Sequence, residues 1–151
     1  MPESAFKKKW VRDVLVTYFM SRVWLATLIR SKEKKPKITH LVTDEIHQVP
    51  TAAKLVAETI TEGRKHGIDY YFTCQFLKQF KELLDGMEGA GASYMLLAGT
   101  HKKNFIALKE ECGEFTLEEL MKMKKFHSFN IIQTSEGTKN FISELPVPLE
   151  M

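Results

Sequence analysis

Cysteines and long apolar runs are scarce in this chain of 151 residues. The only two cysteines, Cys74 and Cys112, belong to no CxxC motif and no Cys/His cluster, which excludes a disulfide scaffold and favours a reduced, cytoplasmic setting. The longest apolar stretch, residues 14–29, is interrupted by Arg22 and is too short to cross a bilayer comfortably. No small-residue cleavage site follows the lysines at 7–9, so we expect neither a signal peptide nor a transmembrane segment.

Net charge is also low. The chain has 22 Lys and Arg against 19 Asp and Glu, a formal charge of +3, so charge alone does not indicate a nucleic-acid binder. Lysine groups at 7–9, 32–37 and 122–125 fit either solvated helix faces and a linker or the lining of a DNA channel in a ring of subunits. With 44% hydrophobic residues, one domain with a real core is expected.

Apolar periodicity predicts alternating helices and strands. A long helix is expected from about residue 6 to residue 30, followed by the solvated run SKEKKPK. Thr116 and Glu119 form a capping-box pattern, and Ser135-Glu136-Gly137 indicates a hairpin. The other expected elements are strands at 38–45, 68–75 and 93–99, helices at 51–67, 76–87, 102–112 and 116–126, and two strands within 129–145.

This alternation predicts an α/β fold, a three-layer sandwich whose mostly parallel sheet is covered on both faces and ends in a β-hairpin. We expect a single domain over 1–151, with an N-terminal helix and linker at 1–36 and a core at 37–148. Ligand chemistry in such sheets lies at the carboxyl ends of the strands, so the polar residues at those ends are the candidate site.

Two expected strands end in residues suited to nucleotide hydrolysis. After the first come Asp44 and Glu45, of which one carboxylate could hold Mg²⁺ through water while the other polarises the attacking water. The next strand ends in Gln75, whose amide could contact both the water and a phosphate. Arg64, near a helix end, could reach a phosphate of its own or a neighbouring subunit's nucleotide. The alternatives are a solvated strand terminus for the acidic pair and a helix-dipole partner for Arg64.

Taken in order, DEIHQ, EGRKHGI and YYFTCQ resemble the second half of the ATPase core of the FtsK and HerA-like P-loop superfamily. The most similar branch is the conjugative coupling proteins and related type IV secretion ATPases, and the resemblance extends over residues 20 to 148. It implies a RecA-like fold with Asp44 and Glu45 as the Walker B pair, Gln75 as the sensor glutamine and Arg64 as an arginine finger.

The resemblance also implies cofactors and partners. ATP and Mg²⁺ would be the cofactors, with Asp44 holding the metal through water. The parent protein would form a hexameric ring, translocate DNA or a DNA–protein substrate, and work with other proteins of the conjugation or secretion machinery, in the cytoplasm or at the cytoplasmic face of the membrane.

A phosphate-binding loop of the form G-x-x-x-x-G-K-[ST] is missing. The chain contains no Gly-Lys dipeptide, residues 1–45 contain no glycine, and GMEGAGAS at 86–93 lacks the lysine and leads into an expected strand. We therefore expect the chain to be the C-terminal part of a longer protein and, alone, to hydrolyse ATP negligibly.

Other interpretations stay open. DEIH also matches the DExH box of helicases, which would make the chain a helicase fragment. A non-catalytic interaction domain with a degenerate NTPase fold could use Tyr18, Phe19 and Trp24 of the N-terminal helix for docking, although aromatic residues at helical spacing also suit a core. Zinc binding by His40, His47 and Cys74 is not expected, because their spacing suits no common structural site.

Overall fold

The computed structural model describes residues 8–30, 32, 37–81 and 83–146. It is an α/β structure, as predicted, and its chain forms two compact units. The first consists of the described residues up to Cys74 together with Gln79–Ala90, and the second of Gln75–Lys78 together with the described residues from Gly91 onward.

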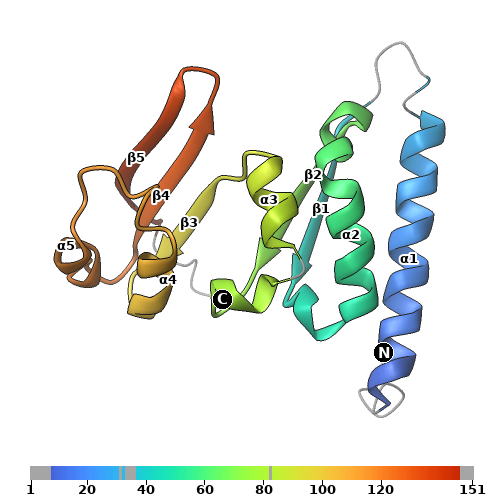
Figure 1. Cartoon of the computed structure of the whole chain (residues 1–151), viewed down its shortest axis with the longest axis horizontal. Coiled ribbons are helices and arrows are strands. Elements are labelled where there is room, and N and C mark those ends of the chain that lie inside the picture. The colour runs from blue at the N-terminus through green and yellow to red at the C-terminus, as the bar shows by residue number, and fades with distance from the viewer. Residues whose placement is uncertain (1–7, 31, 33–36, 82, 147–151) are drawn as a thin grey trace. The chain divides into compact units, whose positions relative to one another are not determined.

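The first unit is built on two parallel strands (Figure 1). β1 pairs with β2 in a register that begins at Thr39 opposite Ile68 and ends at Asp44 opposite Thr73. Pro50 occupies the first turn of helix α2, where its missing N–H costs nothing, and Gly67 at φ 74° supplies the left-handed turn into β2. The elements of this part are α1 (Lys9–Arg30), β1 (Thr39–Asp44), η2 (Ile46–Gln48), α2 (Pro50–Gly63), η3 (Arg64–His66), β2 (Ile68–Thr73) and α3 (Leu84–Gly89). The short helix η4 (Leu77–Phe80) has its first two residues in the second unit and its last two in the first.

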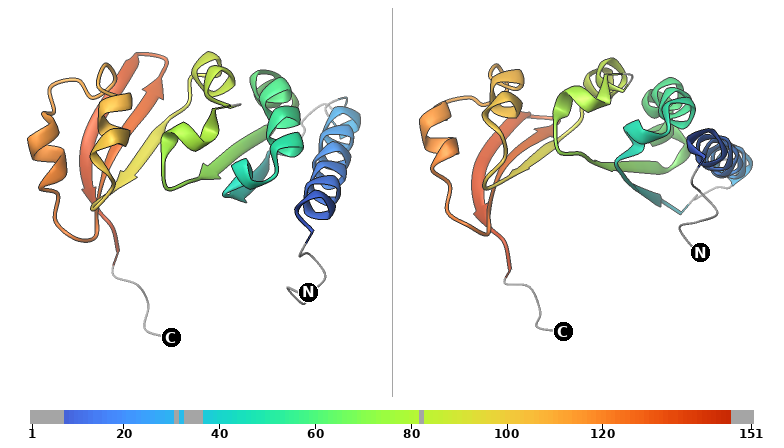
Figure 2. Two further views of the ribbon diagram at one scale, coloured as in Figure 1. Left: turned by 60° about the horizontal axis from the view of Figure 1, so that its bottom comes forward. Right: turned by 90° about the horizontal axis from the view of Figure 1, so that it is seen from below.

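Helices cover one face of this strand pair. α2 and α3 lie on the same side of β1 and β2, with α1 packed beside α2 (Figure 2). Along β1 the side chains alternate between partly buried and exposed positions, as expected when only one face of a strand packs. On the other face Val42 is 69% exposed and Tyr71, which pairs with it, is 50% exposed. Among the described residues of this unit, that second face has no covering layer.

The second unit is a three-stranded antiparallel sheet with two short helices on one face. β3 pairs with β4, and β4 pairs with β5 through the predicted hairpin around Ser135-Glu136-Gly137. The predicted capping box of Thr116 and Glu119 is also confirmed. The elements are β3 (Tyr94–Leu97), α4 (Lys102–Ala107), α5 (Leu117–Met121), β4 (His127–Thr134) and β5 (Gly137–Glu144), and the core between them consists of Leu96, Phe105, Leu108, Cys112, Leu120, Phe129 and Ile131.

The expected mostly parallel sheet is not what the described residues form, since only β1 and β2 run parallel and β3 is antiparallel to β4. The physical reason lies in the burial of β3. Strands of parallel sheets are buried on both faces, whereas Met95 and Leu97 of β3 are exposed and only its other face packs on the core. Sequence alternation of strands and helices does not fix strand direction, and here it was a poor guide for the third strand.

Several expected boundaries also differ. The helix expected at 76–87 is divided into η4 and α3, and the strand expected at 68–75 ends at Thr73. The N-terminal helix is described from Lys9, while most of the SKEKKPK run and the lysines at 7 and 33–36 lie outside the described residues. No helix in the described part of the chain has the length and apolarity needed to cross a membrane.

Candidate functional site

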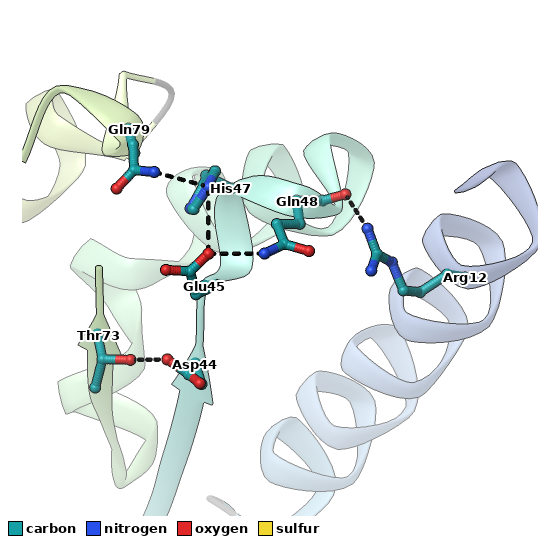
Figure 3. A network of polar contacts seen from close by, with 7 residues as sticks. All are labelled: Arg12, Asp44, Glu45, His47, Gln48, Thr73 and Gln79. Carbon is teal, nitrogen blue, oxygen red and sulfur yellow. Dashed lines mark hydrogen bonds and ion pairs between the residues drawn. The ribbon is translucent and has the colours of Figure 1, made fainter. Parts of the chain in front are cut away.

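The parallel register brings Asp44 to the end of β2. Thr73 Oγ1 donates a short hydrogen bond to Asp44 Oδ1, and the backbone N–H of Glu45 donates to the carbonyl of Thr73 at 3.1 Å (Figure 3). Both strands therefore end at one edge with a carboxylate and a hydroxyl side by side. Carboxylate and hydroxyl oxygens are ligands that Mg²⁺ accepts in phosphoryl-transfer sites, where the substrate's phosphates and water complete its shell.

Glu45 has an unusual backbone. Its φ of 52° and ψ of 41° lie in the left-handed region, which L-residues other than Asn and Asp seldom adopt. Such conformations persist where surrounding structure holds them, and they gather at functional sites. At Glu45 the turn directs the side chain away from the strand and toward η2, where it meets Gln48 and His47.

Three polar side chains form a chain of contacts with Glu45 (Figure 3). Gln48 Nε2 donates to Glu45 Oε2 at 2.7 Å, and His47 Nε2 lies 3.7 Å from the same oxygen. Gln79 Nε2 lies 3.1 Å from His47 Nε2, and because an amide nitrogen only donates, His47 Nε2 accepts this hydrogen bond. The carboxylate is thus oriented by the Gln48 amide, lies near His47, and is only partly exposed to solvent.

A cleft of about 440 Å³ adjoins the carboxylates within the first unit. Its apolar wall comes from α1 and the segment after β1, and its one cationic side chain is Arg12. Arg12 Nη2 donates to the carbonyl of Gln48 at 3.2 Å, while its Nε is buried without a hydrogen-bond partner. The cleft is lined by Arg12, Val16, Met20, Thr43, Asp44, Glu45, Ile46, Gln48 and Val49.

The pKa of the Cys74 thiol reflects both burial and charge at this edge of the strands. Burial raises the pKa of its thiol to about 11, and the negative charge of Glu45 adds to the shift. Both causes disfavour the thiolate, so Cys74 is almost entirely a neutral thiol at physiological pH and a slow nucleophile.

Gln75, the expected sensor residue, belongs to the second unit. Its backbone carbonyl accepts a hydrogen bond at 3.0 Å from Nδ2 of Asn104, which is a residue of α4. The structure therefore brings Asp44 and Glu45 together in the first unit and holds the backbone of Gln75 in the second.

Arg64 lies at the other end of the parallel pair. It follows α2 in η3 and precedes β2, so it is at the amino edge of the strands, whereas the carboxylates are at the carboxyl edge. A six-residue strand spans about 17 to 20 Å, which separates exposed Arg64 from Asp44 of the same subunit by more than a side chain can reach. This position does not suit contact with a phosphate near Asp44 of the same subunit, whereas the helix-dipole role fits it, because Arg64 is the C-cap residue of α2. Action on a neighbouring subunit's nucleotide stays a prediction.

Sequence reasoning missed several residues around the carboxylates. Thr73 could have been found from the parallel register, because the two strands end together. Gln48, three residues after Glu45, follows from the tight turn of η2. Arg12 and Gln79 carry no local signal, since each reaches the site through tertiary packing.

The described residues include no group of three or more His, Cys, Asp or Glu side chains placed to hold a metal ion. His40 instead lies 3.5 Å from Asp69 Oδ2 and 3.4 Å from the Tyr71 hydroxyl. A magnesium ion held by Asp44 through water would need phosphate oxygens from its nucleotide as further ligands. Comparison of the chain with protein-family models, with curated proteins and with solved structures gave no match.

Proposed function

We propose that this chain is the C-terminal part of the motor domain of an ATP-driven translocase that moves DNA or DNA–protein substrates in conjugation or type IV secretion. The observation that carries the proposal is the strand-end geometry of the first unit. Asp44 lies beside Thr73 at the carboxyl edge of a parallel pair, and Glu45 follows in a constrained turn with its carboxylate oriented by Gln48.

Each residue has a role in this proposal. Asp44, with the Thr73 hydroxyl beside it, holds the water shell of Mg²⁺ bound to ATP. Glu45 orients and polarises the attacking water, and Gln75 contacts that water and the terminal phosphate. Arg64 acts as an arginine finger toward the nucleotide of the next subunit in a hexameric ring, which agrees with its exposed position away from the carboxylates of its own subunit.

A motor of this kind would have a RecA-like core, and this chain would supply only part of it. Among the described residues, β2 hydrogen-bonds to β1 alone and β3 to β4 alone, so each sheet has an edge available for another strand. A strand, phosphate-binding loop and helix from sequence outside these 151 residues would supply the N–H cradle that the chain lacks. The parent would contact DNA and other proteins of the transfer machinery, in the cytoplasm or at the membrane's cytoplasmic face.

The test compares ATP turnover by the 151-residue chain with turnover by a version extended at its N-terminus by the upstream coding sequence. We expect negligible turnover by the short chain and measurable turnover by the extended one. Glu45→Gln should reduce turnover of the extended chain by about 100-fold or more, whereas Glu62→Gln, an exposed position on α2, should leave it unchanged. An upstream sequence without a Gly-Lys-Ser or Gly-Lys-Thr loop, or turnover indifferent to Glu45→Gln, would refute the proposal.

The second candidate is a non-catalytic interaction domain, and the feature favouring it is α1. Large apolar side chains of this helix are exposed in the described structure: Trp10, Val14, Leu15, Tyr18, Phe19, Leu25 and Ile29. The helicase-fragment alternative has no such feature in its favour. It depends on the DEIH sequence, and His47 of that sequence contacts Gln79 and Glu45 within the first unit. Protein association that survives Glu45→Gln and is insensitive to nucleotide would favour the interaction domain.

A further inference from the structure

The segment that carries Gln75 is held by a side chain of α4. Asn104 Nδ2 donates to the carbonyl of Gln75 at 3.0 Å, and Asn104 Oδ1 accepts from the backbone N–H of Leu77 at 3.0 Å. One amide thus bridges two backbone groups that are two residues apart. Asn104 is only 9% exposed, so its amide has little access to water and these two bonds satisfy it instead.

Packing around the bridge fixes the same segment. The ring of Phe76 lies edge-on to His101, with ring centroids 5.7 Å apart, and Leu77 packs against the buried core of the second unit. The N-terminus of α4 is itself ordered, because the His101 side chain accepts from the backbone N–H of Lys103 at 3.2 Å. Residues 75–77 are therefore attached to the second unit by two hydrogen bonds from Asn104 of α4, a ring contact with His101 and an apolar contact with the core.

Strand β2 does not provide an equivalent attachment. Its pairing with β1 ends at Thr73, and the chain divides between the two units after Cys74. The backbone of Gln75 is thus hydrogen-bonded within the unit that contains α4 and the antiparallel sheet, in a segment, Gln75–Lys78, that is flanked in the sequence by residues of the first unit.

We propose that Asn104 is the positioning residue for Gln75: it holds the backbone from which the Gln75 amide projects. This inference rests on the proposed function for the role of Gln75, but the attachment itself does not.

The test uses Asn104→Asp, which keeps the acceptor for Leu77 N–H and replaces the donor to Gln75 with a carboxylate oxygen facing its carbonyl. The matched control is Asn140→Asp. Asn140 Nδ2 donates to the carbonyl of Glu111 at 2.6 Å, so this change removes the same kind of bond in the same unit without touching Gln75.

In the extended chain, Asn104→Asp should lower kcat by roughly 10- to 100-fold while KM for ATP stays within about twofold. Asn140→Asp should leave kcat unchanged even where it lowers the melting temperature. In a Gln75→Ala background, Asn104→Asp should have little further effect on kcat, because its target is already gone. Equal kcat for the two Asp variants, or an unreduced effect of Asn104→Asp in the Gln75→Ala background, would overturn the inference.

Hydrogen exchange on the 151-residue chain separates this inference from the proposed function. Asn104→Asp should speed exchange of the backbone amides of 75–78 relative to Asn140→Asp. Equal exchange in both variants would overturn the attachment whether or not the extended chain hydrolyses ATP. Faster exchange with no ATP turnover by the extended wild type would retain the attachment and reject the motor, and with it the role given to Gln75.

Discussion

The thiol of Cys74 offers a direct test of the strand-end geometry in the isolated chain. Its pKa is raised from 9.0 to about 11, first by burial and second by the charge of Glu45. Replacing Glu45 with Gln removes the charge and leaves the burial. The pKa of Cys74 should therefore fall, but not to its ordinary value, and the thiolate should become more abundant at any pH below 9.

The size of the effect follows from the two pKa values. At pH 8 a thiol of pKa 9.0 is about one-tenth ionised, whereas one of pKa about 11 is ionised in roughly one molecule in a thousand. The more basic thiolate is also the stronger nucleophile, and a Brønsted slope of about 0.4–0.5 offsets roughly tenfold of that deficit. Cys74 should then react with a disulfide reagent about tenfold more slowly than an unperturbed cysteine, before any steric shielding.

The assay follows mixed-disulfide formation by peptide mass spectrometry between pH 7 and 10.5. In the wild type the rate at Cys74 should keep rising with pH beyond 9, because the thiol is still largely protonated there. Glu45→Gln should speed the reaction severalfold at pH 8, and Glu62→Gln should not. A rate that levels off near pH 9, or identical rates for the two Gln variants, would refute the placement of Glu45 beside Cys74.

Two further predictions concern stability. Gly63→Ala should destabilise the first unit by about 1–3 kcal/mol, because the added Cβ would lie 2.5 Å from Cε2 of the Tyr70 ring; Gly89→Ala, whose Cβ would meet only ordinary contacts, should leave the melting temperature nearly unchanged. Hydrogen bonds from Thr116 lower the pKa of Glu119, so the stability they add is present above the carboxyl's ordinary pKa of 4.5 and is lost as pH falls through its lower folded value. Thr116→Ala removes the hydroxyl bond and keeps the backbone one, so it should reduce this part of the pH dependence, and an unaltered profile of melting temperature against pH would contradict it.

Local patterns predicted much of the fold. The strand expected at 38–45, the capping box of Thr116 and the hairpin at 135–137 all depend on residues a few positions apart; the capping box and hairpin are confirmed, and the strand forms over Thr39–Asp44. The partner and direction of β3 depend on contacts with β4 more than thirty residues later. A four-residue strand carries too few side chains to show from sequence whether one face or both will be buried.

In the candidate site, too, features set by neighbouring residues could be predicted from the sequence, and features set by distant contacts could not. Adjacent carboxylates after an apolar strand were evident, but the left-handed turn at Glu45 was not, because glutamate gives no signal for that conformation. The position of Arg64 could have been deduced, since a helix that leads into a parallel strand ends at that strand's amino edge. The bridge from Asn104 could not, because it joins residues 27 and 29 positions apart.

Among the described residues, one face of β1 and β2 has no covering layer, and this face could accommodate the helix that follows a phosphate-binding loop. Asp44 and Thr73 lie on the same face as Val42 and Tyr71, since alternate residues of a strand share a face and the pairs are in register. Parallel strands are almost always buried on both faces, and a two-stranded sheet alone is marginally stable. A helix laid over this face would bury Val42 and Tyr71, which contributes about 1.5–3 kcal/mol for each large apolar side chain fully buried. If the N-terminus of that helix lay at the carboxyl edge, its free N–H groups would face a phosphate held near Asp44. Under the proposed function, one added strand–loop–helix segment would supply the sheet edge, the covering layer and the phosphate cradle together.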